Sequence, residues 1–125
     1  MLKGKTATAT VAVSDLGRAR DFYEKTLGLE ASGRQEEGTV TYGAGGAALF
    51  VYTSNYAGTN QATGVTWDVG GEIDRIVKDL AGKGLKFEHY DMPGMTLKGD
   101  IHEAQGMRVA WFKDPDANIH ALIGA

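Results

Sequence analysis

The predicted order of secondary structure repeats once along the 125 residues of this chain, and that repeat restricts the fold more than any other feature. Each half reads as one strand, one helix and three further strands, with glycine-rich boundaries. Val13 and Gly28, which bracket the first helix, are separated by the same 15 positions as Val69 and Gly84 in the second half. Equal spacing is what an internal duplication predicts. We therefore expect an α+β fold built from two βαβββ modules.

A polar segment divides the two predicted modules. The stretch "TSNYAGTNQATG" is rich in residues that favour turns. We predict module one at about 4–53, a linker at about 54–63 and module two at about 64–125. A chain of this length buries one substantial core but is short for two ordinary domains, so residues 1–125 are expected to form a single domain.

Alternation in the first strand of each module assigns its side chains to two faces. In "TATATVAV", Thr8 and Thr10 fall on a hydroxyl-bearing face and the valines on an apolar face. In "GVTWDV", Thr66 and Asp68 share one face, and Trp67 points to the other, where we expect it to pack beneath the second helix. Helical apolar spacing follows each strand, in "SDLGRARDFYEKTLG" and in "EIDRIVKDLAGKG".

Composition excludes several classes of function. The formal net charge of -3, without a basic cluster, argues against nucleic-acid binding. No apolar run approaches the ~20 residues of a membrane-spanning helix, and the start of the chain lacks a hydrophobic signal core, so we expect no membrane partner and a cytoplasmic protein. The absence of cysteine excludes disulfides and thiolate nucleophiles. A small organic molecule is the expected partner.

Two stretches resemble the vicinal oxygen chelate superfamily, which includes glyoxalase I, fosfomycin and bleomycin resistance proteins, and extradiol dioxygenases. They are "VAVSDLGRARDFYEKTLGLE" near the start and "VAWFKDPDAN" near the end, and with the repeat they extend the resemblance over nearly the whole chain. The resemblance implies a glyoxalase-like fold, in which two βαβββ modules form curled mixed sheets around a cavity, and it implies a homodimer. It does not imply one activity, because this fold supports many.

The resemblance also implies where a metal ion would bind. Metal-dependent members commonly use a His or Gln on the first strand, a His or Glu on the first strand of the second module, and a Glu on the last strand. Matched on "VSDL", "TWDV" and "DPDAN", these positions hold Thr8, Gly64 and Ala121. Thr8 is a poor ligand and the other two side chains carry no donor atom. We therefore expect no metal and no other cofactor at the family site.

A divalent metal at a site that the family does not use is the remaining alternative. The candidate ligands are His89, His102, Glu103 and His120. His102 and Glu103 are adjacent, so on a strand they would point to opposite faces, and His120 should point away from the face of Ala121. None of these spacings forces several ligands to converge, as a metal site requires. We expect histidines that are exposed or hydrogen-bonded within the fold.

The stretch "WFKDPDANIHALI" predicts the last β-hairpin. Pro115 presets its turn, and Asp114, Asp116 and Asn118 can bond the turn backbone. The family usually has glycine where this chain has Ala117, which is unfavourable if that residue keeps a positive φ. We interpret the turn as structural.

Strand alternation predicts the lining of the cavity. The candidate ligand-binding residues are Thr8, Thr10, Thr66, Asp68 and Trp111, beside the apolar Val109, Ile119 and Ala121. Hydroxyls beside a large aromatic ring suit an organic ligand. Asp68 is the one candidate catalytic residue, because a carboxylate that is desolvated becomes a stronger base. Alternatively, Asp68 is a strand-end residue that faces solvent or an arginine.

The segment from Tyr90 to Gly106 is long for a connection between two strands. It is either a lid, with Tyr90, Met92 and Met95 closing over an apolar ligand, or a surface loop packed by its own side chains.

Three functions remain open at this point. The first is a metal-independent small-molecule binding protein that holds its ligand in an apolar cavity. The second is a lyase, isomerase or dioxygenase, either metal-free with Asp68 as base or with a relocated metal site. The third is an accessory module that only dimerises. The absence of family metal ligands favours the first.

Overall fold

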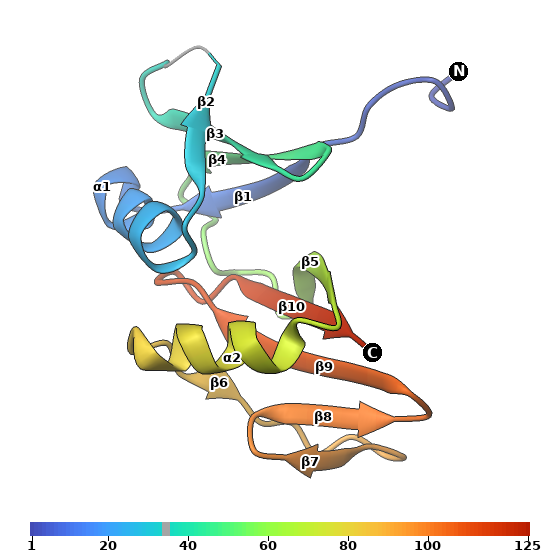
Figure 1. The fold of residues 1–125 in the computed structure, drawn as a ribbon. Coiled ribbons are helices and arrows are strands. Elements are labelled where there is room, and N and C mark those ends of the chain that lie inside the picture. The colour runs from blue at the N-terminus through green and yellow to red at the C-terminus, as the bar shows by residue number, and fades with distance from the viewer. Residues whose placement is uncertain (34–35) are drawn as a thin grey trace. The chain divides into compact units, whose positions relative to one another are not determined.

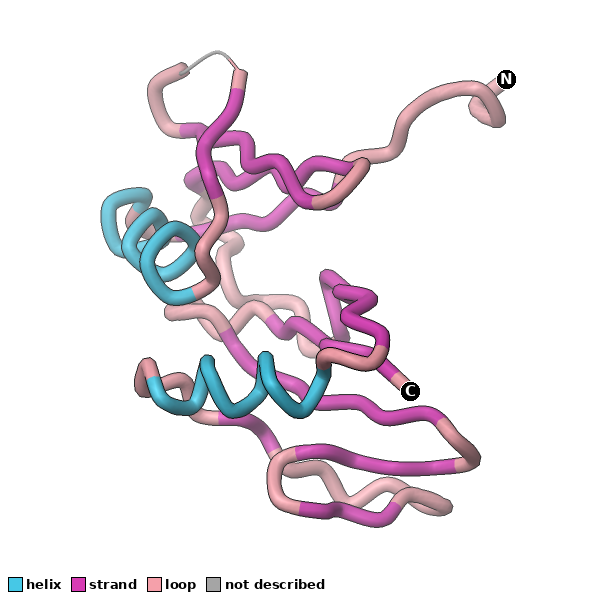
Figure 2. The backbone as a smooth tube through the Cα atoms, in the orientation of Figure 1, coloured by secondary structure: helices cyan, strands magenta, loops and turns pink. Residues whose placement is uncertain are grey.

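The computed structural model describes residues 1–33 and 36–125 and divides the chain into two compact units, Met1–Gly58 and Thr59–Ala125. Each unit contains its own mixed sheet and helical segment (Figures 1 and 2). In the described part of the chain, every helix is too short or too polar to traverse a bilayer.

The first unit is a four-stranded sheet with one helical segment. Its strands lie in the order β1-β4-β3-β2, with β1 parallel to β4 and the other pairs antiparallel. The elements are β1 Ala9–Val13, α1 Leu16–Arg20, the π-helical segment η1 Asp21–Thr26, β2 Glu30–Ser32, β3 Thr39–Ala44 and β4 Ala47–Thr53. The sequence predicts a strand around Glu30 to Gln35; β2 ends at Ser32, and the last two positions of the prediction lie outside the described residues.

The helical segment covers one face of this first sheet. Tyr42 of β3 is fully buried, stacks on Tyr23 of η1, and donates its hydroxyl hydrogen to Glu24 Oε2 at 2.8 Å. Arg20 donates to the same oxygen at 2.7 Å. Burial and the Glu24 carboxylate raise the pKa of Tyr42, so its hydroxyl remains a donor. This contact joins the helix to the sheet.

The second unit repeats this topology and extends it. Its strands lie in the order β5-β10-β9-β8-β7, with β5 parallel to β10, and β6 also pairs with β9. The elements are β5 Thr63–Gly70, α2 Ile73–Gly82, β6 Phe87–Glu88, β7 Thr96–Lys98, β8 Ile101–Ala104, β9 Met107–Lys113 and β10 Ile119–Gly124. The predicted α+β class with two mixed, curled sheets is confirmed.

One part of the second unit differs from the sequence expectation. The segment from Tyr90 to Gly106 is not a plain loop, because it contains β7 and β8, which pair with each other and extend the sheet beyond β9 (Figure 1). The sequence also predicts a strand in "LKFEHY", of which only Phe87 and Glu88 form a strand, β6. Gln105 and Gly106, with φ values of 49° and 81°, form the tight turn into β9.

The turn between β9 and β10 has the structural role that its sequence predicts. Asp114 is buried, and its Oδ1 accepts the backbone N–H groups of Asp116 and Asn118, each at 2.9 Å. The Asn118 amide donates to Asp114 Oδ2 at 2.8 Å. Ala117 has a φ of 70°, a conformation in which a Cβ atom is strained.

We expect Ala117→Gly to stabilise the protein by roughly 0.5–1 kcal/mol, because glycine removes the Cβ strain at positive φ. Urea unfolding measures the change in the free energy of unfolding. Ala81→Gly, at an exposed position in the last turn of α2, is the control and should not stabilise the protein, because glycine has a lower helix propensity than alanine. A destabilising effect of Ala117→Gly would contradict the assigned turn conformation.

Gly124 of the last strand lies against Gly70 and against Ile73 at the start of α2. A Cβ atom there would overlap the Gly70 carbonyl oxygen and lie 3.1 Å from Ile73 Cβ. Gly124→Ala is therefore expected to cost about 1–3 kcal/mol of stability through overpacking. At Gly71 an added Cβ meets no atom within 4 Å, so Gly71→Ala should change the urea midpoint little. Equal effects of both substitutions would refute the close approach.

Candidate functional site

The sheet of the second unit has one face covered by α2 and one face turned away from it. Arg108 of β9 lies on the covered side, since its guanidinium forms two hydrogen bonds of 2.7 and 2.6 Å with Asp74 of α2. Strand alternation therefore turns the neighbouring residues Val109 and Trp111 the other way. We call that other side the open face.

Strand register brings several predicted site residues together on the open face. Trp111 pairs with Ala121, which pairs with Thr66, and Val109 pairs with Ile123, which pairs with Asp68. Directly paired residues project from the same face of a sheet. The second unit thus gathers three of the predicted ligand-binding residues, Thr66, Asp68 and Trp111, on one surface.

Trp111 is the largest side chain of this surface and is only partly buried. Its indole N–H donates to Thr63 Oγ1 at 3.2 Å, which fixes the ring orientation. The Tyr90 ring meets it edge-on, with ring centroids 5.3 Å apart and an angle of 71° between the planes. Aromatic pairs in this geometry are favourable and present a rigid apolar wall.

His102 of β8 also belongs to the open face, although the sequence indicated it only as a candidate metal ligand and not as part of the ligand-binding face. It pairs with Val109 across the sheet, is 1% exposed, and lies edge-on to Trp111 at 4.9 Å between ring centroids. Its strand was taken as part of a long loop, so its face was not assigned. Alternation through "TLKGDIHEA", with a turn at Gly99, was the signal that would have placed it.

Asp68 is an exposed side chain whose Oδ1 accepts the backbone N–H of Gly70 at 3.1 Å. That bond closes a local turn at the end of β5. Asp68 therefore lacks the desolvation that the general-base hypothesis requires.

The remaining predicted ligand-binding residues, Thr8 and Thr10, belong to the first unit. Thr8 precedes β1, which begins at Ala9, and its carbonyl oxygen accepts the Thr10 hydroxyl at 3.2 Å. Thr10 pairs with Phe50 on the face away from the helix, where Phe50 stacks on Tyr52 at 6.1 Å. Phe50 and Tyr52 are not among the site residues that the sequence predicts.

The residues at the family's metal positions do not suit a metal ion. Thr8 offers only a neutral hydroxyl, Gly64 has no side chain and Ala121 has no donor atom. Within residues 1–33 and 36–125, no three or more His, Asp or Glu side chains group in a way that could hold an ion. The donor set therefore supports no chemistry through a metal at these positions.

His120 lies on the opposite face from Ala121, inside the core beneath α2. It is fully buried, stacks on Phe112 at 4.9 Å, and its Nδ1 accepts the Trp67 indole N–H at 3.1 Å. Trp67 thus packs on the covered side, as its alternation predicts. Burial lowers the pKa of His120 to about 4, so the ring is neutral near pH 7.

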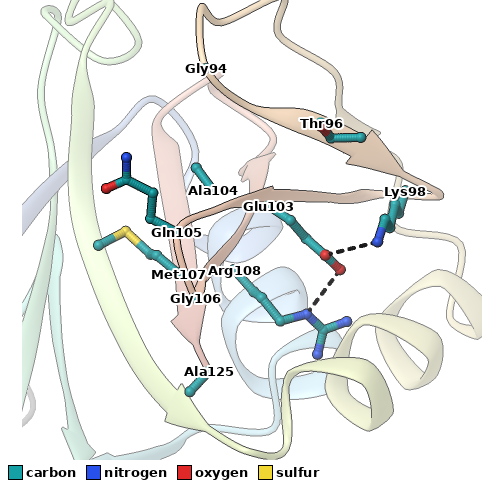
Figure 3. A pocket seen from close by; sticks show the side chains of 10 residues that line it. All are labelled: Gly94, Thr96, Lys98, Glu103, Ala104, Gln105, Gly106, Met107, Arg108 and Ala125. Atoms are coloured by element: carbon teal, nitrogen blue, oxygen red, sulfur yellow. Dashed lines mark hydrogen bonds and ion pairs between the residues drawn. The ribbon is translucent and has the colours of Figure 1, made fainter.

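A polar surface pocket of about 450 Å³ lies beside the turn between β8 and β9 (Figure 3). Glu103 forms ion pairs with Lys98 at 3.2 Å and with Arg108 at 3.3 Å. Arg108 also binds Asp74 and holds the pKa of the Asp74 carboxyl below its usual range. These charges satisfy one another. The pocket therefore offers weaker binding chemistry than the aromatic open face.

Comparison with known proteins identifies the family. Residues 5–122 match the model of the Glyoxalase/Bleomycin resistance protein/Dioxygenase superfamily, so the chain belongs to this superfamily. The predicted resemblance is confirmed. A search of the curated proteins finds no match to this chain.

Solved structures with this fold have diverse functions. A lactoylglutathione lyase from Agrobacterium tumefaciens superposes with a TM-score of 0.72 at 16% identity, covering 100% of this chain and 96% of that one. An antibiotic binding protein from Streptomyces sp. CB03234 gives 0.67 at 21%, covering 99% and 98%. The fosfomycin resistance protein FosX from Mesorhizobium loti gives 0.69 at 14%, covering 100% and 94%. These identities show a shared fold alone.

The buried His120 predicts a specific dependence of stability on pH. The unfolded ring takes up a proton near its ordinary pKa of 6.5, whereas the folded ring does so only at about 4. The contribution of the neutral His120 ring to the free energy of unfolding therefore has its full value above pH 6.5 and is lost as the pH falls toward 4. At about 1.4 kcal/mol per pKa unit, the loss is about 3 kcal/mol.

Urea unfolding of the wild type and of His120→Gln between pH 4 and pH 7.5 tests this prediction. A glutamine Oε1 can still accept the Trp67 indole N–H but does not titrate. The variant should show a shallower fall in stability over this range. Identical pH profiles for the two proteins would show that His120 does not remain neutral in the fold.

Proposed function

We propose that this chain is a metal-independent small-molecule binding protein that holds an organic ligand in an apolar cavity, one wall of which is the open face of the second sheet. The observation that carries the proposal is the partly exposed Trp111 ring, set edge-on to Tyr90 and oriented by Thr63. An aromatic wall beside hydroxyls suits stacking and orientation of a flat organic molecule.

Two further observations support this proposal. The residues at the family's metal positions are poor ligands or have no donor, which favours binding without an ion. The superfamily name includes bleomycin resistance proteins, and one structural neighbour is an antibiotic binding protein. Binding a small molecule without converting it is therefore a function that this fold supports.

The enzymatic alternative is a lyase, isomerase or dioxygenase of the same superfamily. Its metal-free form needs Asp68 as a base, but that carboxylate is exposed and engaged with the Gly70 N–H. Its metal-dependent form needs ligands at a site that the family does not use.

A cytoplasmic location and a homodimer remain predictions from the sequence and the family.

Titration with the neutral fluorescent probe N-phenylnaphthylamine, in the presence of EDTA, tests the proposed function. We expect saturable binding, and we expect Trp111→Ala to weaken it at least tenfold, about 1.4 kcal/mol. Trp67→Phe, on the face covered by α2, is the aromatic control and should bind as the wild type does. No saturable binding, or equal binding by Trp111→Ala, would overturn the proposal.

Elemental analysis of untagged protein incubated with nickel, manganese, zinc and ferrous iron tests metal independence separately. We expect no stoichiometric ion and unchanged probe binding after the incubation. A stoichiometric ion would instead favour the metal-dependent enzyme.

A further inference from the structure

We propose that His102 is a positioning residue that holds Tyr90 against Trp111, so that the two rings form a preorganised wall for planar aromatic ligands. The inference rests on the proposed function, because it names the ligand class of the same open face. It assigns a role to a buried histidine for which the proposed function alone has no use.

The hydrogen bonds of His102 define one arrangement of its ring. Its Nδ1 lies 3.4 Å from the Val109 carbonyl oxygen, which can only accept a hydrogen, so Nδ1 carries the proton. Its Nε2 is then the acceptor, and the backbone N–H of Tyr90 donates to it at 3.0 Å. A buried imidazole thus satisfies both nitrogens only while Tyr90 stays in place.

The Tyr90 ring lies on the open face. It stacks on the His102 ring, with centroids 6.3 Å apart and planes 27° from parallel, and meets Trp111 edge-on. His102 in turn lies edge-on to Trp111. The three rings therefore form one packed cluster, in which His102 is covered and the other two are partly exposed.

A second contact restrains the segment that follows Tyr90. His89 Nε2 lies 2.7 Å from Asp100 Oδ1, which joins the residue before Tyr90 to the residue before β8. The chain between them is mostly exposed and includes Met92. Two anchors at the base of an exposed segment reduce the conformational freedom that Tyr90 would lose on ligand binding.

Preorganisation of this kind favours flat, rigid ligands. Two rings held at 71° present a face and an edge to an incoming molecule, and a planar aromatic ring can contact both. A flexible aliphatic ligand of similar size gains less, because its own ordering costs free energy. The arrangement therefore predicts a preference for planar aromatic molecules over aliphatic ones.

Matched substitutions at His102 test the inference. His102→Leu removes the acceptor while keeping an apolar side chain, and His102→Gln restores an acceptor for the Tyr90 N–H. Without ligand, we expect amide hydrogen exchange at Tyr90 to accelerate at least tenfold in His102→Leu and to recover in His102→Gln. Unchanged exchange in His102→Leu would overturn the positioning role.

Probe binding then separates the inference from the proposed function. We expect N-phenylnaphthylamine to bind about five- to tenfold more weakly to His102→Leu, with recovery in His102→Gln, and to bind the wild type more tightly than decanol does. Wild-type affinity in His102→Leu, or equal affinity for the two probes, would overturn the inference while leaving the proposed function intact. If the wild type binds neither probe, the proposed function fails, and the exchange measurement still decides whether His102 holds Tyr90.

Tyr90→Leu provides a second variant in case His102→Leu does not fold. It removes the ring but keeps the backbone N–H that bonds His102. We expect it to weaken probe binding as His102→Leu does, without accelerating exchange at position 90. Full affinity in Tyr90→Leu would overturn the proposed aromatic wall.

Discussion

Parallel pairing between the first and last strands of each unit is the constraint on which the other features depend. β1 pairs with β4, and β5 pairs with β10, in parallel register. Parallel neighbours require a crossover connection, which here begins with the helical segment and places it against one face. Each sheet then has a covered face that forms the core and a second face available for other contacts. The side of every strand residue follows from alternation.

The two buried histidines of the second unit show how this division gives one residue type two roles. His120 lies on the covered face and its Nδ1 accepts from Trp67, so it completes the core. His102 lies on the open face and its Nε2 accepts from the backbone of Tyr90. Both satisfy the requirement that buried polar atoms be hydrogen-bonded, and the described residues contain no buried side-chain N or O atom without a partner. The face of the sheet on which each histidine lies decides which neighbouring residue it restrains.

Local patterns placed part of the candidate site. Strand alternation put Thr66 and Asp68 on one face and Trp67 on the other, because a strand side chain reverses direction at every residue. The same reasoning did not place Tyr90, which was predicted only as part of a possible lid, or His102, which was considered only as a metal ligand. Glycines at 94, 99 and 106 break the segment into pieces too short to show an alternating pattern. Pairing of β8 with β9, which joins residues that are not adjacent in sequence, is what makes that segment part of the sheet.

The amino-acid sequence by itself determined the α+β class, the repeated module, the superfamily and the poor donor set at the family's metal positions, because these depend on residue types and local spacing. The tertiary structure alone decided that Asp68 is exposed and that His102 lies against Tyr90 and Trp111. Burial and ring contacts arise from strands brought together over long sequence separations. No local pattern specifies which side chains those pairings will cover.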